Sequence, residues 1–149
     1  MAKVGRAAFN SSRMRFEALG DANKTITSAE TGEVYALTVD LTTNRTITLP
    51  APQDGAYFKF MIMADLDGGN LIIQSASTAD YMIGGIAHQD SDGTTVNFVQ
   101  SAATDTADVM TIKGDDDGAQ YGSWVELVSD GTYWYYTGVV HSDQIPTIA

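Results

Sequence analysis

Short runs of apolar residues follow one another along most of the chain, at a spacing of roughly ten positions from Thr25 onward, with turn-forming Gly, Asp, Asn and Pro residues between them. In one run, Tyr35 and Leu37 alternate with Ala36 and Thr38. This two-residue period is typical of a half-buried β-strand. We expect strands at Tyr35–Leu41, Thr46–Leu49, Tyr57–Met63, Asn70–Gln74, Thr94–Val99, Asp108–Lys113, Gly122–Ser129 and Thr132–Val140.

Local composition adds detail to three places in this pattern. The run Tyr57–Met63 is apolar on both faces apart from Lys59, which predicts a central strand covered on both sides. Pro50 and Pro52 end the preceding strand, because proline has no amide hydrogen to donate to a ladder. The pair at positions 84 and 85 is Gly-Gly between apolar residues, and we expect a bend there.

The last two runs predict a hairpin whose two-residue turn is Asp130-Gly131, a pair suited to positive φ. That loop length places Leu127 opposite Trp134 and Val125 opposite Tyr136, on a face that belongs to the core. The other face is unusually aromatic for a solvated surface. We expect it to carry Trp124, Glu126, Val128, Tyr133 and Tyr135.

Together these runs predict an all-β protein. A chain of 149 residues fits one domain. We expect a single antiparallel β-sandwich or jelly-roll-like domain over residues 25–140, because many short strands separated by turns are typical of those architectures. A basic N-terminal arm, residues 1–24, precedes it, and residues 141–149 form a C-terminal tail.

Charge is distributed unevenly along the chain. Residues 1–24 hold five of the eight basic residues and only two acids, so they carry +3 while the remainder carries −14. This polarity predicts an arm that meets an acidic surface and a body that repels its neighbours and stays soluble. A solvated terminus without a specific partner explains the same charges equally well. The five basic residues are Lys3, Arg6, Arg13, Arg15 and Lys24.

Composition also limits the functional classes. The chain has no cysteine, which excludes disulfides, thiolate metal sites and cysteine nucleophiles. No apolar run is long enough to cross a bilayer, and the first residues lack the apolar segment of a secretory signal, so we expect no membrane partner and assembly in a cytoplasm. The acidic body repels phosphate, so we expect no nucleic-acid binding by it.

Catalysis has little support in the sequence. His88 and His141 are the only imidazoles, and neither stands beside a candidate nucleophile. We therefore expect a non-enzymatic protein without a cofactor or a resident metal. A pair of carboxylates brought together by the fold, about 5–10 Å apart, is the arrangement that would make it an enzyme acting on glycans.

Two acidic turns raise the question of calcium. Asp65, Asp67 and Asn70 offer oxygen ligands in one turn, and Asp115–Asp117 offer them in another. Neither turn is followed by the bidentate acid that completes an EF-hand loop. Asp and Gly are also ordinary turn residues, and we favour plain turns.

The aromatic residues of the hairpin allow two interpretations. Trp124, Tyr133 and Tyr135 offer flat rings that suit a sugar. Aromatic side chains are also enriched where subunits meet. We favour the subunit interface and keep glycan binding as the alternative.

Two stretches resemble β-rich virion proteins of tailed bacteriophages. In that class a Thr-Leu-Pro strand and turn, here residues 46–55, precedes a central strand, here Tyr57–Met63. A hairpin similar to residues 123–134 closes the domain. Residues 15–34, which begin Arg-Phe-Glu-Ala-Leu, are similar to small head-decoration (cement) proteins.

The resemblance implies a structural protein that decorates the capsid exterior and binds where capsid subunits meet, with the major capsid protein as partner and assembly in the bacterial host cytoplasm. It further implies a homo-oligomer, a trimer. We expect Trp124, Tyr133 and Tyr135 to form the subunit interface. The alternative is a tail-fibre or spike domain that binds a host surface glycan, with one of these rings in an open groove. We expect the capsid-docking arm to use Lys3, Arg6, Arg13, Arg15 and Phe16.

Overall fold

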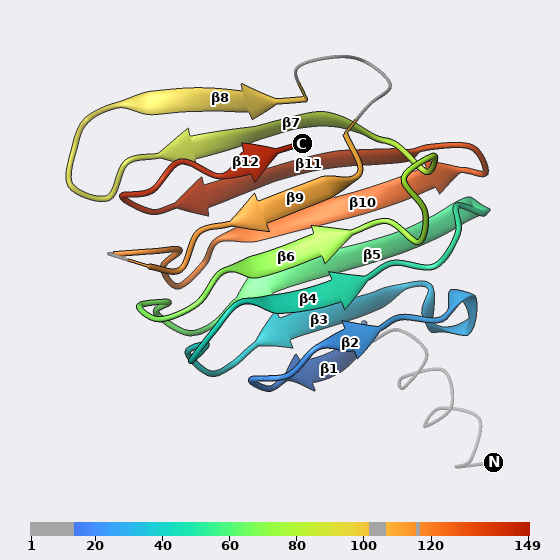
Figure 1. Cartoon of the computed structure of the whole chain (residues 1–149), viewed down its shortest axis with the longest axis horizontal. Coiled ribbons are helices and arrows are strands. Elements are labelled where there is room, and N and C mark those ends of the chain that lie inside the picture. Colours follow the sequence, from blue (N-terminus) through green and yellow to red (C-terminus); the bar gives the residue numbers. More distant parts are fainter. Residues whose placement is uncertain (1–13, 102–106, 116) are drawn as a thin grey trace, which may run out of the picture.

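The computed structural model describes residues 14–101, 107–115 and 117–149. Two β-sheets pack face to face and enclose one core (Figure 1). Within the described residues, no helix is long and apolar enough to cross a membrane. The elements are β1 (Arg15–Leu19), β2 (Lys24–Thr25), the 3-10 turn η1 (Ser28–Glu30), β3 (Glu33–Leu37), β4 (Arg45–Thr48), β5 (Asp54–Ile62), β6 (Leu71–Gln74), β7 (Met82–Gln89), β8 (Val96–Gln100), β9 (Val109–Ile112), β10 (Trp124–Asp130), β11 (Trp134–His141) and β12 (Thr147–Ile148).

Successive strands cross from one sheet to the other. The seven-stranded sheet has the order β1-β3-β5-β10-β11-β7-β8, and the five-stranded sheet has the order β12-β9-β6-β4-β2. The first six strands alternate strictly between the sheets, so β1, β3 and β5 are parallel to one another, as are β2, β4 and β6. The hairpin β10–β11 then lies between β5 and β7.

This winding corrects the predicted strand directions. The all-β class and the two packed sheets are confirmed, but both sheets are mixed, so the predicted antiparallel arrangement is wrong and the jelly-roll-like topology is not confirmed. Alternation of apolar and polar residues reports which face of a strand is buried and carries no information about which strand lies beside it. Connections that cross between the sheets place parallel strands side by side where a hairpin would have made antiparallel ones.

The core fills the space between the inner faces of the sheets. Its largest side chains are aromatic and fully buried: the ring centroids of Tyr35 and Phe60 lie 5.5 Å apart, and those of Phe58 and Trp134 lie 5.6 Å apart. Offset or tilted aromatic pairs at such distances stabilise a core beyond the area they bury. Tyr35 and Phe60 lie opposite each other in the β3–β5 ladder. Core contacts therefore form between neighbouring strands of one sheet as well as between the two sheets.

Several predicted strands need correction. The central position of β5 is confirmed, but its outward residues Tyr57, Lys59 and Met61 are only partly covered, so the strand is buried on one face. The predicted strand Tyr35–Leu41 ends at Leu37. Four strands had no prediction: β1, β2, β7 and β12.

The predicted glycine bend lies in the middle of strand β7. Gly84 pairs with Tyr136, and a Cβ at Gly84 would collide with the carbonyl oxygen of Tyr136. Gly85 pairs with Thr137 on the outer face. Glycine at position 84 therefore allows a close approach of two backbones in an extended strand, which is the alternative meaning of a glycine inside a strand.

The final hairpin is confirmed with a different register. Leu127 pairs with Tyr136, where the prediction had Trp134, and the last pair of the ladder is Ser129 with Trp134. The loop of the hairpin is therefore two residues longer than predicted. The carboxylate of Asp130 accepts the amide hydrogens of Thr132 and Tyr133, which holds the wider turn. A shift of two residues keeps every side chain on its predicted face, because the period of a strand is two.

Candidate functional site

The outer face of the seven-stranded sheet carries an apolar row that crosses all seven strands. Registers of the adjacent ladders align one residue from each strand. From β1 to β8, the apolar row consists of Ala18, Ala36, Met61, Trp124, Val139, Ala87 and Phe98. Directly opposite side chains contact one another across a ladder, so the row is continuous.

The apolar row is exposed most strongly at its β8 end. Phe98 has 83% of its surface exposed, Trp124, Val139 and Ala87 are half-buried, and Ala36 is fully buried. A contiguous apolar patch that includes so exposed an aromatic side chain is typical of an interaction site. The next row along the strands is more polar and includes Lys59 and Glu126.

A groove of about 570 Å³ lies over strands β7, β8, β10 and β11, with Trp124 and Phe98 among its lining residues. Small residues of β7 lie between these two rings: Ala87 pairs with Val139 of β11 and with Phe98 of β8, and Gly85 lies two residues along the same strand. None of the residues that line the groove is charged. They are Gly84, Gly85, Ala87, Phe98, Val99, Gln100, Trp124, Thr137, Gly138 and Val139.

The indole of Trp124 is held in place by a neighbouring cation. Lys59 Nζ lies 4.5 Å from the ring centroid and 4.0 Å from Glu126 Oε2. Tyr57 donates its hydroxyl hydrogen to the same carboxylate at 3.1 Å, and burial together with the charge of Glu126 raises the pKa of Tyr57. The ammonium over the ring and the ion pair beside it favour this position of the Trp124 indole.

Of the three predicted interface residues, Trp124 alone lines the groove. Tyr133 stacks on Tyr81, with ring centroids 6.2 Å apart. Tyr135 donates its hydroxyl hydrogen to Asp130 Oδ2 at 3.0 Å. The amide hydrogens of Tyr133 and Thr132 lower the pKa of the Asp130 carboxyl, and the bond to Asp130 raises the pKa of Tyr135. The contacts of both tyrosines thus lie at the turn end of the hairpin.

The predicted docking arm is only partly described. Lys3, Arg6 and Arg13 lie outside the described residues. Arg15 and Phe16 belong to β1 and are exposed; Arg15 Nε lies 3.8 Å from Glu33 Oε1. The boundary at residue 24 does not separate an arm from the body, because β1 and β2 pair within the two sheets. Docking by residues 1–13 stays a prediction.

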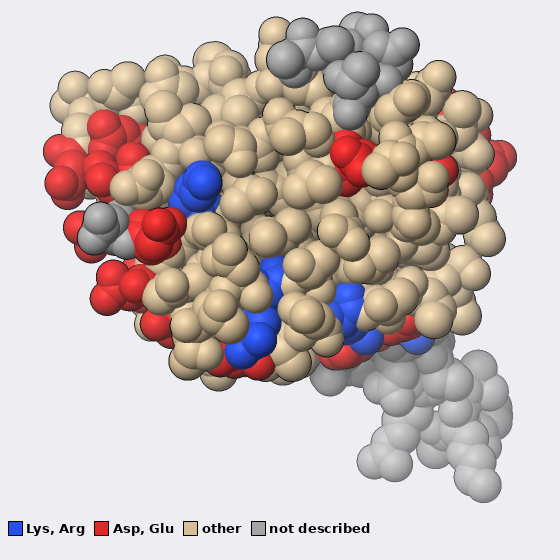
Figure 2. Space-filling view, viewed as in Figure 1, with Lys and Arg blue, Asp and Glu red and all other residues tan. Residues whose placement is uncertain are grey.

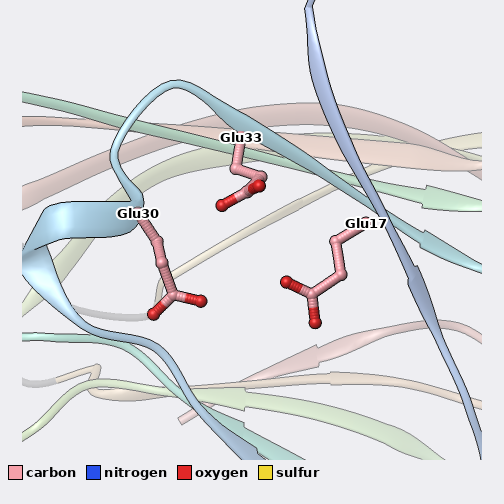
Figure 3. A group of neighbouring side chains, drawn as sticks. All are labelled: Glu17, Glu30 and Glu33. Atoms are coloured by element: carbon pink, nitrogen blue, oxygen red, sulfur yellow. The ribbon is translucent and has the colours of Figure 1, made fainter.

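Three glutamates meet at the margin where β1, η1 and β3 come together (Figure 3). Glu17, Glu30 and Glu33 each offer a carboxylate oxygen, and these oxygens lie within 4.8 Å of one another. The ammonium of Lys24 already lies among them, 3.0 Å from Glu17 and 2.9 Å from Glu30. The cluster therefore carries its own cation, and its geometry is that of a structural ion-pair network.

The same cluster has one strongly shifted acid. The amide hydrogen of Thr27 and the bonds from Lys24 and the Thr27 hydroxyl lower the pKa of Glu30 to about 2. Tyr35 also donates its hydroxyl hydrogen to Glu30 at 3.2 Å. The sequence signal that predicts this arrangement locally is Thr27 followed by Glu30, a capping box at η1. Glu17 joins the cluster from strand β1, and no motif in the neighbouring sequence predicts that contact.

The two turns considered for calcium lie side by side. Asn70 Oδ1 accepts the amide hydrogen of Gly114 at 2.9 Å, and the amide of Leu66 bonds to the carbonyl of Ala119. The side-chain oxygen of Asn70 is thus already bonded within the protein. Among the described residues, the acids of these turns do not form a group of three that could share an ion. In the view of Figure 1, acidic side chains gather most densely at the left end of the molecule, and others lie along the lower margin beside Lys and Arg side chains (Figure 2).

The two histidines are separated by environment. His88 is buried in β7, and its Nε2 lies 2.9 Å from the carbonyl oxygen of Ser142. His141 is half-buried at the end of β11.

A second groove, of about 380 Å³, lies over β2, β4 and β6. Neither this groove nor the groove beside Trp124 is lined by a pair of carboxylates.

No family model, curated protein or solved structure matches the chain.

Proposed function

We propose that this chain is a non-enzymatic structural protein of a tailed bacteriophage, which decorates the capsid exterior by binding where capsid subunits meet. One observation carries the proposal: the apolar row, which is exposed at Phe98 and partly exposed from Ala87 to Met61, on an otherwise strongly acidic body. A protein that remained alone in solution would gain nothing from this row and would risk aggregation. A protein whose outer sheet face is covered in an assembly gains an interface with an apolar centre.

The sequence resemblance supports the same class. The Thr-Leu-Pro stretch supplies β4 and the turn into the central strand β5, and the closing hairpin supplies β10 and β11. Strand β10 lies beside β5 in the seven-stranded sheet, so both resembling stretches contribute to one structural unit. Trp124, which comes from the hairpin, and Met61, which comes from the central strand, are neighbours in the apolar row.

The physical role of such a protein is to link its neighbours. Each contact that a decoration protein adds between capsid subunits raises the free energy needed to separate them. The acidic body points away from the shell and discourages particles from clumping. In this arrangement Lys3, Arg6 and Arg13 meet acidic patches of the major capsid protein, and the apolar row, with Trp124 at its centre, contacts a neighbouring copy of the chain.

The test is co-sedimentation of the protein with undecorated capsids. The deletion covers residues 1–13, because a longer one would remove β1 and its ladder with β3. We expect saturable binding by the full chain, loss of binding on deletion, and at least tenfold weaker binding for Trp124→Ala. Val128→Ala, on the same face but outside the apolar row, is the matched control. Absence of saturable binding by the folded full chain contradicts the proposal.

A second candidate is glycan binding in the groove lined by Trp124 and Phe98. The observation that favours it is an open, uncharged groove with aromatic rings, which suits the C–H face of a neutral sugar. Trp134 is fully buried, so a change in tryptophan emission on adding host surface polysaccharide reports on Trp124. An emission shift that Trp124→Phe abolishes, from a chain that does not bind capsids, would favour a fibre or spike domain.

A further inference from the structure

Strand β8 forms an edge of the seven-stranded sheet and lacks the usual protection of an edge. It pairs with β7 on one side, and no other described strand pairs with it (Figure 1, yellow). Its sequence, Val-Asn-Phe-Val-Gln, contains neither a charge nor a proline. Phe98 is 83% exposed and Val96 is 59% exposed. Its unpaired backbone groups and apolar side chains together form a template for another strand.

The other described edges are protected in recognised ways. Strand β1 carries Arg15 and Glu17. Strands β2 and β12, the edges of the five-stranded sheet, are two residues long. Charge and short length are the common devices that prevent one sheet edge from pairing with another. Among the described edge strands, only β8 has neither charge nor short length, which indicates that this edge has a partner.

We propose that β8 pairs antiparallel with β8 of a second copy of this chain, around a two-fold axis at Phe98. The strand has five residues with Phe98 in the middle, so the two phenylalanines lie opposite each other. Val96 of each copy then lies opposite Gln100 of the other. Such an interface is isologous: one patch serves both sides and closes the assembly at two copies.

Charge decides the direction of the pairing. Asp90 and Asp92 lie in the turn that leads into β8, and the whole chain carries −11. Antiparallel pairing puts the two acidic turns at opposite ends of the new ladder. A parallel pairing would place them side by side, where like charges repel. The uncharged strand is thus the part of this edge where two acidic bodies can approach each other.

The pairing extends the apolar row. Phe98 ends the row in each copy, so the two-fold axis joins two rows into one that crosses fourteen strands, seven from each copy. Side chains that face outward in one copy face outward in the other, because both belong to the same face of one sheet. Because Ala36 is buried, the apolar surface that the dimer presents to a further partner runs from Met61 of one copy to Met61 of the other. This inference does not depend on a capsid as that partner.

The experiment is sedimentation equilibrium of the full chain over a wide concentration range. One strand pair is a small interface, so we expect a mass that rises with concentration towards twice the chain mass. Phe98→Lys should weaken association at least tenfold, because it places like charges opposite each other. Val128→Lys, exposed on the same face but in the centre of the sheet, is the matched control and should associate like the unchanged chain.

Cysteine cross-linking tests the register and keeps Phe98 in place. The chain has no cysteine, so each introduced thiol is unique. Directly opposite residues of an antiparallel pair lie about 4.5–5.5 Å apart between Cα atoms, which a disulfide can span. Mild oxidation of a mixture of Val96→Cys and Gln100→Cys chains should yield the mixed dimer in large excess over either homodimer.

Four results would overturn the proposal. The unchanged chain stays monomeric at every concentration, Phe98→Lys associates as the unchanged chain does, or the mixed disulfide forms no faster than the homodimers. Equal weakening by Val128→Lys also contradicts it, because that result places the contact on the sheet face and not on the β8 edge.

Discussion

The seven-stranded sheet ends in β1 on one side and in β8 on the other, and the two edge strands differ in kind. Strand β1 carries Arg15 and Glu17, whose carboxylate joins the ion-pair network with Lys24. Strand β8 carries no charge and leaves Phe98 open to solvent. One edge is closed to strand pairing by charge, and the other is left able to accept a strand.

The difference follows from how each edge is supported. At the β1 edge, the glutamate cluster joins β1, η1, β2 and β3, so its charges stabilise the fold locally. At the β8 edge, support comes from the backbone, since β7 lies close against β11 through Gly84. The charged side chains at the β1 edge stabilise the fold, whereas the uncharged β8 edge is available for association. Stability and association are thus assigned to opposite edges of this sheet. Three predictions test the separation.

The largest effect is expected at Gly84, which permits the close approach of β7 to β11. Gly84→Val places side-chain atoms against the carbonyl of Tyr136, and we expect the free energy of unfolding to fall by about 3 kcal/mol. Gly85→Ala is the matched control: its nearest atom, the carbonyl oxygen of Val99, lies at an ordinary 3.5 Å. Chemical denaturation measures both. Equal losses for the two variants would show that the close approach at Gly84 does not support this edge.

An intermediate effect is expected at Glu30, in the network at the opposite edge. Its folded pKa of about 2 lies below the ordinary 4.5, so its contribution to stability is complete above pH 4.5 and is lost as the pH falls towards 2. We expect Glu30→Gln to lower the free energy of unfolding by about 1 kcal/mol at pH 7. Between pH 4.5 and 2, its stability should fall less steeply than that of the unchanged chain. Parallel curves for the two proteins contradict this assignment.

The smallest effect on stability is expected at the exposed phenylalanines of the two edges. Phe98→Ser and Phe16→Ser should each change the free energy of unfolding by no more than about 0.5 kcal/mol, because both rings are more than half exposed. Their effects on association should differ: Phe98→Ser weakens self-association and Phe16→Ser leaves it unchanged. Sedimentation of both variants measures this difference, and equal behaviour would remove the contrast between the edges.

Much of the fold was predictable from local pattern. Eight strands were predicted where β3, β4, β5, β6, β8, β9, β10 and β11 lie, because alternation of apolar and polar residues reports burial directly. Strand β7 was missed because Gly84 and Gly85 are typical of bends when only neighbouring residues are considered. The Asp130-Gly131 turn was correctly located, and its register missed by two residues because the Asp130 carboxylate holds a wider loop.

The candidate site was predictable only in part. Trp124 was identified as an outward aromatic residue of the hairpin, and it lines the groove. Phe98 was not predicted as a site residue, because nothing near it in the sequence places it on the same face as Trp124. Their relation depends on β11 and β7, which lie between them in the sheet.

The sequence by itself determined the all-β fold class and the faces of the strands, since burial of alternate side chains is a local consequence of a period of two. It also determined the excess of acid over base and the lack of cysteine chemistry. The tertiary structure decided strand direction, strand order, the glutamate cluster and the apolar row. These depend on which strands lie side by side, and the free energy that selects neighbours comes from contacts between residues far apart in the chain.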